Sequence, residues 1–438
     1  MKRPPSPPGG NNVDLQRRSG LVRLSALWAA VSVPLMSCGG GDAPAPNIPP
    51  GPPAPPPGGG GGGSTPPPPP PPPPPAPPPP GPPQATRLNT AARLDAPWSF
   101  AFLPDGRIVF TQKGGTLVVM RADFGALSGA FSGVPAVSTD SQGGLLDIVL
   151  DPDYTTPGSD WVYFSYAEPA SGGFLGTAVN RGRLDLTSNQ LLDVSRDPLF
   201  RQFPKTGIPA HYGSRLAFRG DKTLFITLGE KQSPNLAQDL TTTLGKVVRI
   251  NRDGSIPTNN PDMGAGARPG IWSYGHRNPQ GAAVHPGTGE LWISEHGPQG
   301  GDEINIARAG QNYGWPLRSY GCNYGDTNSN CLIGGGTHEP TYTEPVTWWP
   351  GPGTTPPYSS IAPSAIAFYT GTRFPEWQGS LLVGAQAGQA LWRLTLSGNT
   401  VTARERIWEG ARVRCVRQGP DGWIYFITDD GWLYRIAR

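Results

Sequence analysis

One short pattern recurs six times between residues 98 and 428. Each copy has an alternating apolar segment, a turn rich in Pro, Asp and Gly, and a second apolar segment that in most copies ends in a small or polar residue. The copies lie at residues 98–111, 145–165, 214–227, 280–294, 364–383 and 415–428. Alternation with a period of two between turn residues indicates β-hairpins. Because the copies recur at intervals of roughly 50 to 80 residues, each has room for about four strands.

A repeat of this kind predicts an all-β fold, a six-bladed β-propeller of four-stranded antiparallel blades. No amphipathic helical segment interrupts the pattern, which argues against a fold of alternating strands and helices. A β-sandwich is the alternative, but a sandwich of this length would not repeat one turn motif so often. In a propeller, loops from several blades meet around the central channel, so functional side chains are expected at the strand ends.

The chain before the repeats has a different composition. Residues 39–83 consist almost entirely of Pro and Gly, and residues 66–80 form a nearly unbroken proline run. Such a segment favours an extended polyproline helix and cannot bury a core, so we expect a disordered Pro/Gly-rich tether. The foldable domain is therefore predicted to span residues 84–438.

Residues 1–38 have the features of an export signal. Arginines precede an apolar stretch at 24–36, which is too short to span a bilayer comfortably. The stretch ends in Leu-Met-Ser-Cys-Gly at 35–39, which resembles a bacterial lipobox, in which the cysteine, here Cys38, becomes the lipidated N-terminus. This predicts a periplasmic protein held to the membrane by a lipid anchor alone, and Gly39 favours the outer membrane. An ordinary cleaved signal, an uncleaved anchor and a twin-arginine signal are the alternatives, and all of them lead out of the cytoplasm.

Charge and cysteine content exclude two classes of function. The formal net charge is only +3 and part of it lies in the leader, so we expect no nucleic-acid partner. Cys322 and Cys331 flank a loop rich in Gly, Asn and Asp, and a disulfide between them is expected in an oxidising compartment. Cys415 is then expected to be a buried small apolar residue. No cluster of Cys and His indicates a zinc site.

Polar segments at the predicted strand ends carry the strongest functional signal. They read Ala-His-Tyr-Gly-Ser-Arg-Leu at 210–216, Tyr-Gly-His-Arg-Asn-Pro-Gln-Gly at 274–281, Ser-Glu-His-Gly-Pro-Gln-Gly-Gly-Asp-Glu-Ile-Asn at 294–305 and Gln-Asn-Tyr-Gly-Trp-Pro at 311–316. In this succession they resemble the glucose/sorbosone dehydrogenase family of soluble quinoprotein aldose sugar dehydrogenases, and the resemblance extends from about Ala92 to the C-terminus. It implies an enzyme that oxidises the C1 hydroxyl of an aldose to a lactone. Pyrroloquinoline quinone (PQQ) and calcium are the implied cofactors, and an external electron acceptor is the implied partner.

The resemblance implies that His211 is the catalytic base. Imidazole suits this role because its ordinary pKa of about 6.5 lets it accept a hydroxyl proton near neutral pH while a hydride leaves the same carbon. Glu230 stands where the family usually has an aspartate that orients the base, so the charge is kept on a side chain longer by one methylene. Arg277 and Asn278 match the family's cofactor contacts, with Arg277 near the quinone carbonyl, where a fixed cation stabilises oxyanion character.

Two further arginines match the family's contacts to the carboxylates of the cofactor. Arg412 and Arg414 are separated by one residue, so a strand would present both on one face, as binding of a tricarboxylate requires. Gln386 stands where some members have a cofactor-binding lysine. The sequence therefore predicts one ionic contact fewer to the cofactor.

The resemblance also implies two calcium sites. Gly297 and Pro298 match the turn whose backbone carbonyls bind the catalytic calcium, and neutral oxygen ligands are acceptable to this ion. Glu303 and the carbonyl of Tyr313 match a second site.

The substrate side of the pocket is expected to include Gln142 and Trp349. A Pro, Gly, Thr and Ser insertion follows Trp349. Ala210 stands where strict glucose oxidisers carry an acidic sugar contact beside the base. This difference predicts a broader or different preference among aldoses.

Two other functions are compatible with a propeller. A calcium-dependent hydrolase acting on lactones or phosphate esters would need several carboxylates around the metal, and these motifs do not supply them. A non-catalytic propeller that binds carbohydrate or protein stays open, because Glu230 and Gln386 depart from the family pattern.

Overall fold

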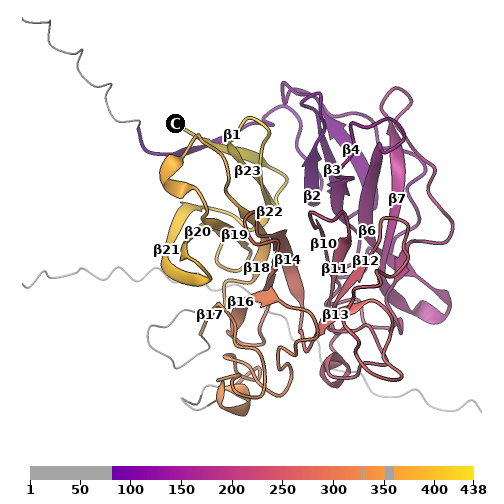
Figure 1. The fold of residues 1–438 in the computed structure, drawn as a ribbon. Helices are drawn as coiled ribbons and strands as arrows, with labels where there is room; N and C mark the ends of the chain where they lie inside the picture. The colour runs from indigo at the N-terminus through magenta and orange to yellow at the C-terminus, as the bar shows by residue number, and fades with distance from the viewer. Residues whose placement is uncertain (1–80, 327, 329–330, 351–359) are drawn as a thin grey trace, which may run out of the picture. The chain divides into compact units, whose positions relative to one another are not determined.

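The described part of the chain folds into a ring of six antiparallel sheets (Figure 1). The structure is a computed structural model that describes residues 81–438, apart from 327, 329–330 and 351–359. Within these ranges the helical content is limited to four short 3-10 helices, at Ser171–Gly173, Pro234–Ala237, Ile333–Gly335 and Pro375–Trp377. None of the helices described is long and apolar enough to cross a membrane. The predicted leader with Cys38 and nearly all of the predicted tether lie outside the described residues.

The sheets follow one another along the chain as the blades of a propeller. The first blade contains β2 (Pro97–Phe102), β3 (Ile108–Gln112) and β4 (Thr116–Met120). The second contains β5 (Leu145–Leu150), β6 (Trp161–Pro169), β7 (Leu175–Asp185), β8 (Gln190–Leu192) and β9 (Phe200–Arg201). The third contains β10 (Gly213–Phe218), β11 (Leu224–Leu228), β12 (Lys246–Ile250) and β13 (Ile271–Tyr274).

The remaining three blades each contain four strands. The fourth contains β14 (Pro279–Val284), β15 (Leu291–Glu295), β16 (Asp302–Ala307) and β17 (Thr347–Trp349). The fifth contains β18 (Pro363–Phe368), β19 (Leu381–Ala385), β20 (Ala390–Ser397) and β21 (Thr400–Glu409). The sixth contains β22 (Val413–Gln418), β23 (Ile424–Thr428) and β24 (Leu433–Ala437), together with β1 (Gln84–Arg87).

The prediction of an all-β, six-bladed propeller is confirmed. The six sequence repeats coincide with the first two strands of the six blades, namely β2–β3, β5–β6, β10–β11, β14–β15, β18–β19 and β22–β23. Four blades have the expected four strands, whereas the first has three and the second has five. In the first blade, the backbone N–H groups of Ser128 and Phe131 donate to the carbonyls of Val119 and Leu117 on β4, so a loop stands in the place of the fourth strand.

The two ends of the domain meet in the sixth blade. Strand β1 pairs antiparallel with β24, with Gln84 opposite Ala437 and Arg87 opposite Tyr434. The inner strands β2, β5, β10, β14, β18 and β22 contact one another in this order, and β22 contacts β2 again. Backbone hydrogen bonds between the first and the last strand therefore close the ring.

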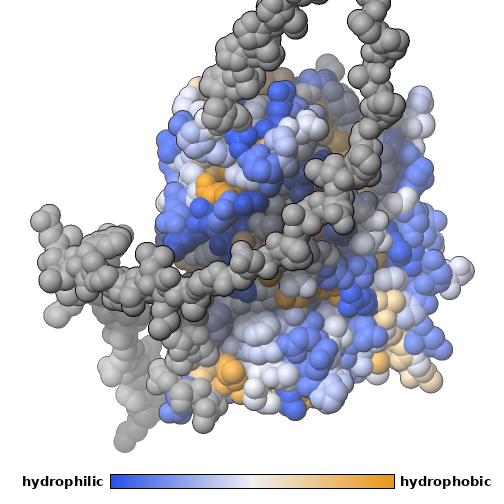
Figure 2. Space-filling model, turned by 60° about the vertical axis from the view of Figure 1, so that its left-hand side comes forward, coloured by the Kyte–Doolittle hydropathy of each residue, from blue (hydrophilic) through white to orange (hydrophobic). Residues whose placement is uncertain are grey.

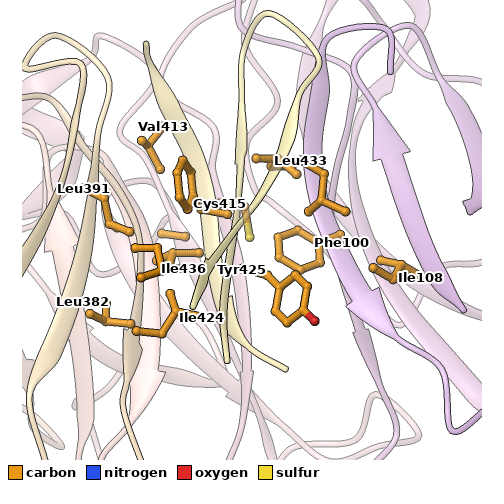
Figure 3. Close-up of a cluster of buried hydrophobic side chains, with 14 of the residues drawn as sticks. Phe100, Ile108, Leu382, Leu391, Val413, Cys415, Ile424, Tyr425, Leu433 and Ile436 are labelled. Carbon is orange, nitrogen blue, oxygen red and sulfur yellow. The ribbon is translucent and has the colours of Figure 1, made fainter. Parts of the chain in front are cut away.

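The apolar core lies in layers between neighbouring blades. Figure 3 shows the layer around the sixth blade, where Leu382 and Leu391 approach from the fifth blade and Phe100 and Ile108 from the first. Full burial of a side chain of this kind stabilises the fold by about 1.5 to 3 kcal/mol. Cys415 is buried in the same layer with a free thiol, as predicted. The face shown in Figure 2 is mostly hydrophilic with a few separate apolar spots, as expected when the apolar side chains lie between the blades.

A hydroxyl near the end of the second strand joins most blades to the next one. We call these contacts inter-blade hydroxyl bonds. The hydroxyl donates to a carbonyl in each case: Thr111 to Leu146, Ser165 to Ser214 (2.7 Å), Thr227 to Pro279 (2.9 Å) and Ser294 to Ser364 (2.7 Å). In the fifth blade Gly384 takes the equivalent position, and the Ser364 hydroxyl donates to the Val413 carbonyl at 2.7 Å instead. The small polar residue that ends most sequence repeats is therefore a buried connection between blades.

All six inner strands shift register against the second strand near their first residues. The shifts lie at 97–99, 145–148, 213–216, 279–281, 363–366 and 413–415. Bulges of this kind bend a strand and change the direction of its side chains. The inner strands begin and the second strands end at the same face of the propeller. The loops at this face carry most of the predicted site residues.

Candidate active site

A central cavity of about 300 Å³ lies at the face of the propeller where the inner strands begin. Its walls are formed by Trp98, Lys113, Gln142, Asn278, Gln280, His296, Gln386, Arg412, Arg414 and Asp429. These residues come from the first, second, fourth, fifth and sixth blades. The third blade contributes His211 beside the cavity, since residues of the cavity wall accept hydrogen bonds from the backbone of His211 and Gly213.

His211 and Glu230 form a buried pair in the loops that flank β10 and β11. The distance from His211 Nδ1 to Glu230 Oε2 is 2.6 Å, and the two residues are 6% and 1% exposed. A carboxylate at Nδ1 fixes the proton on that nitrogen and leaves Nε2 as the basic atom. The additional methylene of Glu230 does not prevent the pairing. Its carboxylate also accepts the backbone N–H of Gln232 at 3.1 Å, which holds it in place.

The backbone at His211 adopts a conformation that is uncommon for a residue with a Cβ. Its φ is +49°, in the left-handed region. The Gln142 side chain accepts the His211 N–H at 2.8 Å, and Asn278 Oδ1 accepts the Gly213 N–H at 3.1 Å. A Cβ at Gly229 would lie 2.1 Å from the His211 carbonyl oxygen, so only glycine fits there. Positive φ values held by surrounding contacts are typical of functional sites.

Arg412 and Arg414 lie on one side of the central cavity and share one carboxylate. Arg412 Nε is 2.8 Å from Asp429 Oδ2, and Arg414 Nε is 2.7 Å from Asp429 Oδ1. Burial alone would raise the pKa of Asp429, but the guanidinium groups of Arg414 and Arg412 hold it below its usual range. Arg412 also donates to Gln386 Oε1 at 2.8 Å, while Nε2 of Gln386 is buried with no partner among the described residues. This donor and the guanidinium groups make the wall suitable for carboxylates.

Arg277 lies at a second, smaller cavity that adjoins the first at His296. Its guanidinium donates to the His296 carbonyl at 3.2 Å and to the Tyr324 hydroxyl at 3.3 Å, and it packs over the Trp315 ring. Burial, and then the positive charge of Arg277, lower the pKa of His296 to about 3. His296 is therefore a neutral side chain at working pH, and its Nε2–H donates to the Pro363 carbonyl at 2.8 Å.

The turn at Gly297 and Pro298 has the donor chemistry that calcium accepts. A Cβ at Gly297 would lie 2.1 Å from the Gly300 carbonyl oxygen, so the tight turn requires glycine. Asp302 accepts the Gly297 N–H at 3.0 Å. Within the described residues, neither the Gly297 nor the Pro298 carbonyl accepts a hydrogen bond. Two neutral oxygens without partners in one turn fit a calcium ion.

The second predicted calcium position is the smaller cavity, whose volume is about 10 Å³. Glu303, Tyr313, Glu295 and His338 are among its walls. Burial, and then the neighbouring Glu295 carboxylate, raise the pKa of Glu303 well above its usual value. Both carboxylates accept hydrogen bonds from Asn305 Nδ2, at 2.8 Å for Glu295 and 3.1 Å for Glu303. Glu295 is already paired with His276 at 3.2 Å, and no group of three or more His, Cys, Asp or Glu side chains placed to hold a metal ion occurs among the described residues. The Glu303 carboxylate is nevertheless an oxygen ligand of the kind that calcium accepts.

Of the two residues expected on the sugar side, only Gln142 lines the central cavity. The structure does not bring Trp349 there. Trp349 is 1% exposed and packs against Trp392 in the core between the fourth and fifth blades. The neighbouring Trp348 stacks instead on Tyr320, with ring centroids 3.8 Å apart. The insertion at 351–359 lies outside the described residues.

The predicted disulfide is present and lies against the turn at Gly297 and Pro298. Cys322 and Cys331 are joined, with Cα atoms 5.1 Å apart. Cys322 exchanges two backbone hydrogen bonds with Gln299, at 3.0 and 3.1 Å. The disulfide loop thus braces the residue that directly follows Pro298.

Sequence reasoning gave no role to several residues of the central cavity, namely Trp98, Lys113, Gln280, His296 and Asp429. His296 lies inside a motif that was assigned to the family, but Lys113 and Asp429 lie in turns between second and third strands. The signal that could have found them is their position, because each directly follows the end of a second strand.

Comparison with known proteins decides the family. The family model for glucose/sorbosone dehydrogenase matches residues 94–435. The chain belongs to the glucose/sorbosone dehydrogenase family. This confirms the resemblance inferred from the motifs, and it makes an oxidoreductase acting on sugars the functional class of the chain.

Relatives within the glucose/sorbosone dehydrogenase family cover nearly the whole domain. The chain is 43% identical over 354 residues to the aldose sugar dehydrogenase YliI of Escherichia coli. This alignment covers 79% of this chain and 91% of YliI. The apo crystal structure of the soluble aldose sugar dehydrogenase from Escherichia coli aligns with a TM-score of 0.73 and 41% identity, covering 81% of this chain and 99% of that one. The PQQ-bound aldose sugar dehydrogenase from Streptomyces coelicolor aligns with a TM-score of 0.64 and 28% identity, covering 81% and 98%.

Proposed function

We propose that this protein oxidises the C1 hydroxyl of aldose sugars to lactones, with PQQ and calcium as cofactors and an external acceptor that reoxidises the quinone. The observation that carries the proposal is the buried pair of His211 and Glu230 beside a cavity lined by cationic side chains. The PQQ-bound relative supports the cofactor. A carbohydrate-binding propeller without activity would not need an oriented base.

His211 is the proton acceptor in this proposal. With Nδ1 hydrogen-bonded to Glu230, Nε2 is the atom that takes the C1 hydroxyl proton. The Glu230 carboxylate stabilises the imidazolium that results, because it lies 2.6 Å away in a site with little water. Gln142 and Asn278 accept the backbone N–H groups of His211 and Gly213, and these bonds hold the loop that presents the imidazole.

Arg412, Arg414 and Asn278 would hold the quinone, and the carbonyls of Gly297 and Pro298 would hold the catalytic calcium. Bound PQQ would supply the acceptor for the hydride that leaves C1, and bound calcium would supply a Lewis acid. Arg277, fixed between Trp315 and the His296 carbonyl, would stabilise negative charge that develops on the quinone. Glu303 and the Tyr313 carbonyl would hold a second calcium.

The substrate is an aldose in this proposal, with a preference that is not restricted to glucose. Ala210 directly precedes the base and offers no charge to a particular sugar hydroxyl. Gln142 contacts the sugar side of the cavity while its Oε1 accepts the His211 N–H.

Replacement of the base separates catalysis from binding. We expect His211→Ala to bind PQQ with wild-type affinity, because Arg412, Arg414 and the calcium turn are unchanged, and to lose about 10²- to 10⁴-fold in turnover. Glu230→Gln serves as the graded control, since it keeps a side chain of the same size and removes only the charge, and its loss should be smaller. The measurement is dye-linked aldose oxidation, with quinone binding determined separately. A His211→Ala variant that oxidises sugars at near the wild-type rate would show that another residue is the base.

We also propose that the protein is exported and that Cys38 carries a lipid anchor in the outer membrane. Cys38 and the predicted tether lie outside the described residues, so this proposal rests on the lipobox-like sequence and on the apolar stretch before it.

A further inference from the structure

Three cations surround one carboxylate in the central cavity. Arg412 and Arg414 pair with Asp429, and Lys113 lies on the wall contributed by the first blade. Asp429 balances one of the three positive charges. The cavity therefore holds an excess of positive charge in a space of about 300 Å³.

The backbone of Lys113 is held firmly at this position. Its N–H donates to the Ala96 carbonyl at 3.0 Å. A Cβ at Gly144 would lie 2.5 Å from the Lys113 carbonyl oxygen, so the glycine allows the loop before β5 to pass directly against it. The turn that presents Lys113 is thus fixed between the first and second blades, which places the start of its side chain at the cavity wall.

The Lys113 ammonium is poorly compensated. Among the described residues its one hydrogen bond is to the Ser141 carbonyl, at 2.9 Å, and no carboxylate pairs with it. Burial, and then the charge of Arg414, lower the pKa of Lys113; the Asp429 charge acts in the opposite direction, and Arg412 lowers the pKa further. Like charges that line one cavity repel one another, and an anion that enters the cavity relieves this repulsion.

The fifth blade adds an amide and no charge to the cavity wall, directly beside Arg412. Gln386 occupies the wall of the fifth blade, with its Nε2 buried and unpartnered among the described residues. An anionic ligand in the cavity therefore meets the two arginines on the sixth blade, an amide on the fifth and an ammonium on the first.

We propose that Lys113 is the third cationic contact for the carboxylates of the quinone and replaces the ion pair that Gln386 cannot form. This inference rests on the proposed function, because it names the ligand of the same cavity. It assigns to Lys113 a role in binding the cofactor and none in proton transfer. The ligand class is an aromatic polycarboxylate, and PQQ is the probe.

The test is titration of the metal-supplemented apoprotein with PQQ at two salt concentrations, followed by tryptophan fluorescence. We expect Lys113→Gln to bind roughly 10- to 100-fold more weakly than the wild type, with a flatter dependence on salt, because one charge-assisted contact is lost. Lys113→Arg should stay within a few-fold of the wild type. Lys222→Gln is the charge-matched control, since Lys222 is paired with Asp153 in the turn at the other end of β10, and it should bind normally.

Two further measurements distinguish binding from a structural role. The apo form of Lys113→Gln should melt at the wild-type temperature or above it, because the substitution relieves repulsion, whereas its stabilisation by PQQ should be smaller. Gln386→Lys added to Lys113→Gln should recover part of the affinity by returning a cation to the cavity wall.

The outcomes separate this inference from the proposed function. Wild-type protein that binds no PQQ would overturn both. Wild type that binds PQQ, with Lys113→Gln binding as tightly, would overturn the role of Lys113 alone. If Lys113→Gln lowers the melting temperature of the apoprotein as much as it lowers that of the PQQ-loaded protein, Lys113 supports the fold and does not bind the cofactor.

Discussion

His211 and Lys231 are buried titratable residues on either side of Glu230, and their surroundings differ sharply. His211 has a carboxylate 2.6 Å from its Nδ1. Lys231 is fully buried with no hydrogen bond to its Nζ from the described residues, and its ammonium lies 3.3 Å from the centroid of the Tyr212 ring. Burial lowers the pKa of Lys231 to about 7, although the Glu230 charge acts in the opposite direction.

The pKa of Lys231 leads to a prediction about stability and pH. Below about pH 7 the lysine is charged in both the folded and the unfolded state, so the full cost of burying the charge opposes folding. As the pH rises toward 10.5, the value of an unperturbed lysine, this cost disappears. We expect Lys231→Met to be more stable than the wild type by roughly 2 to 3 kcal/mol at pH 6, after allowance for the lost ring contact, and by much less at pH 10.

Urea unfolding of both proteins at the two pH values checks this prediction. At each pH, the difference in unfolding free energy between variant and wild type cancels the contributions of all other titrating groups. Lys231→Met that is less stable than the wild type at pH 6 would mean that the contact with Tyr212 outweighs the cost of burial.

The site residues divide into those that sequence can reveal and those that it cannot. His211, Arg412 and Arg414 belong to local strings whose order along the chain is specific, so they were predicted by number. Lys113 was not, because its place directly after a second strand does not by itself distinguish it from other turn residues, and its position is set by its contact with Gly144 in another blade. Trp349 was predicted on the cavity, but neighbouring residues of a strand face opposite sides, and the pair Trp348 and Trp349 gives no indication which side is which.

Among the secondary-structure elements, the second strand has two roles in most blades. Its apolar residues fill the layers between blades, and its terminal hydroxyl makes the inter-blade hydroxyl bond. Thr227 is the clearest case, since its Oγ accepts the Arg215 N–H at 2.9 Å and donates to the Pro279 carbonyl at 2.9 Å, and all of these atoms are buried.

We expect Thr227→Val, which has nearly the same shape, to lower the free energy of unfolding by about 2 to 3 kcal/mol, because it leaves a buried donor and a buried acceptor without partners. Thr402→Val is the control. Thr402 is exposed, and its hydroxyl donates to the Thr395 carbonyl in a similar bond. Loss of this bond should lower the free energy of unfolding by less than about 0.5 kcal/mol. Denaturant unfolding compares the two variants. Equal effects would contradict the assignment of Thr227 as a buried connection between the third and fourth blades.

Element boundaries were predictable where the pattern is local. All six hairpins follow from alternation and turn residues. The closing pair of β1 and β24 was not predicted, because β1 has only four residues, most of them polar, and its partner strand lies at the other end of the domain. The missing fourth strand of the first blade and the additional β9 of the second also depend on packing that local sequence does not encode.

At the scale of the whole molecule, the predicted boundary at residue 84 coincides with the first residue of β1. The catalytic machinery we propose is contained in the domain that begins there, and none of it comes from the leader or the tether. Attachment to the membrane and catalysis should therefore be separable.

We expect Cys38→Ala to move the protein from the membrane fraction to the soluble fraction of the cell, with its turnover in detergent-free extract equal to that of the solubilised wild type. Fractionation followed by an activity assay measures both properties. Wild-type protein that is already soluble without detergent would contradict the lipid anchor at Cys38.

Reconstitution tests whether this propeller is a PQQ- and calcium-dependent aldose dehydrogenase. The purified full-length protein is stripped of divalent ions with a chelator and assayed for dye-linked oxidation across a panel of aldoses, with PQQ alone, calcium alone, and the two together. The account predicts substantial activity only when both are present, and loss of that activity on renewed chelation. Quinone bound in the presence of calcium, with no oxidation of any aldose in the panel, would contradict it and would favour a propeller that binds without catalysis.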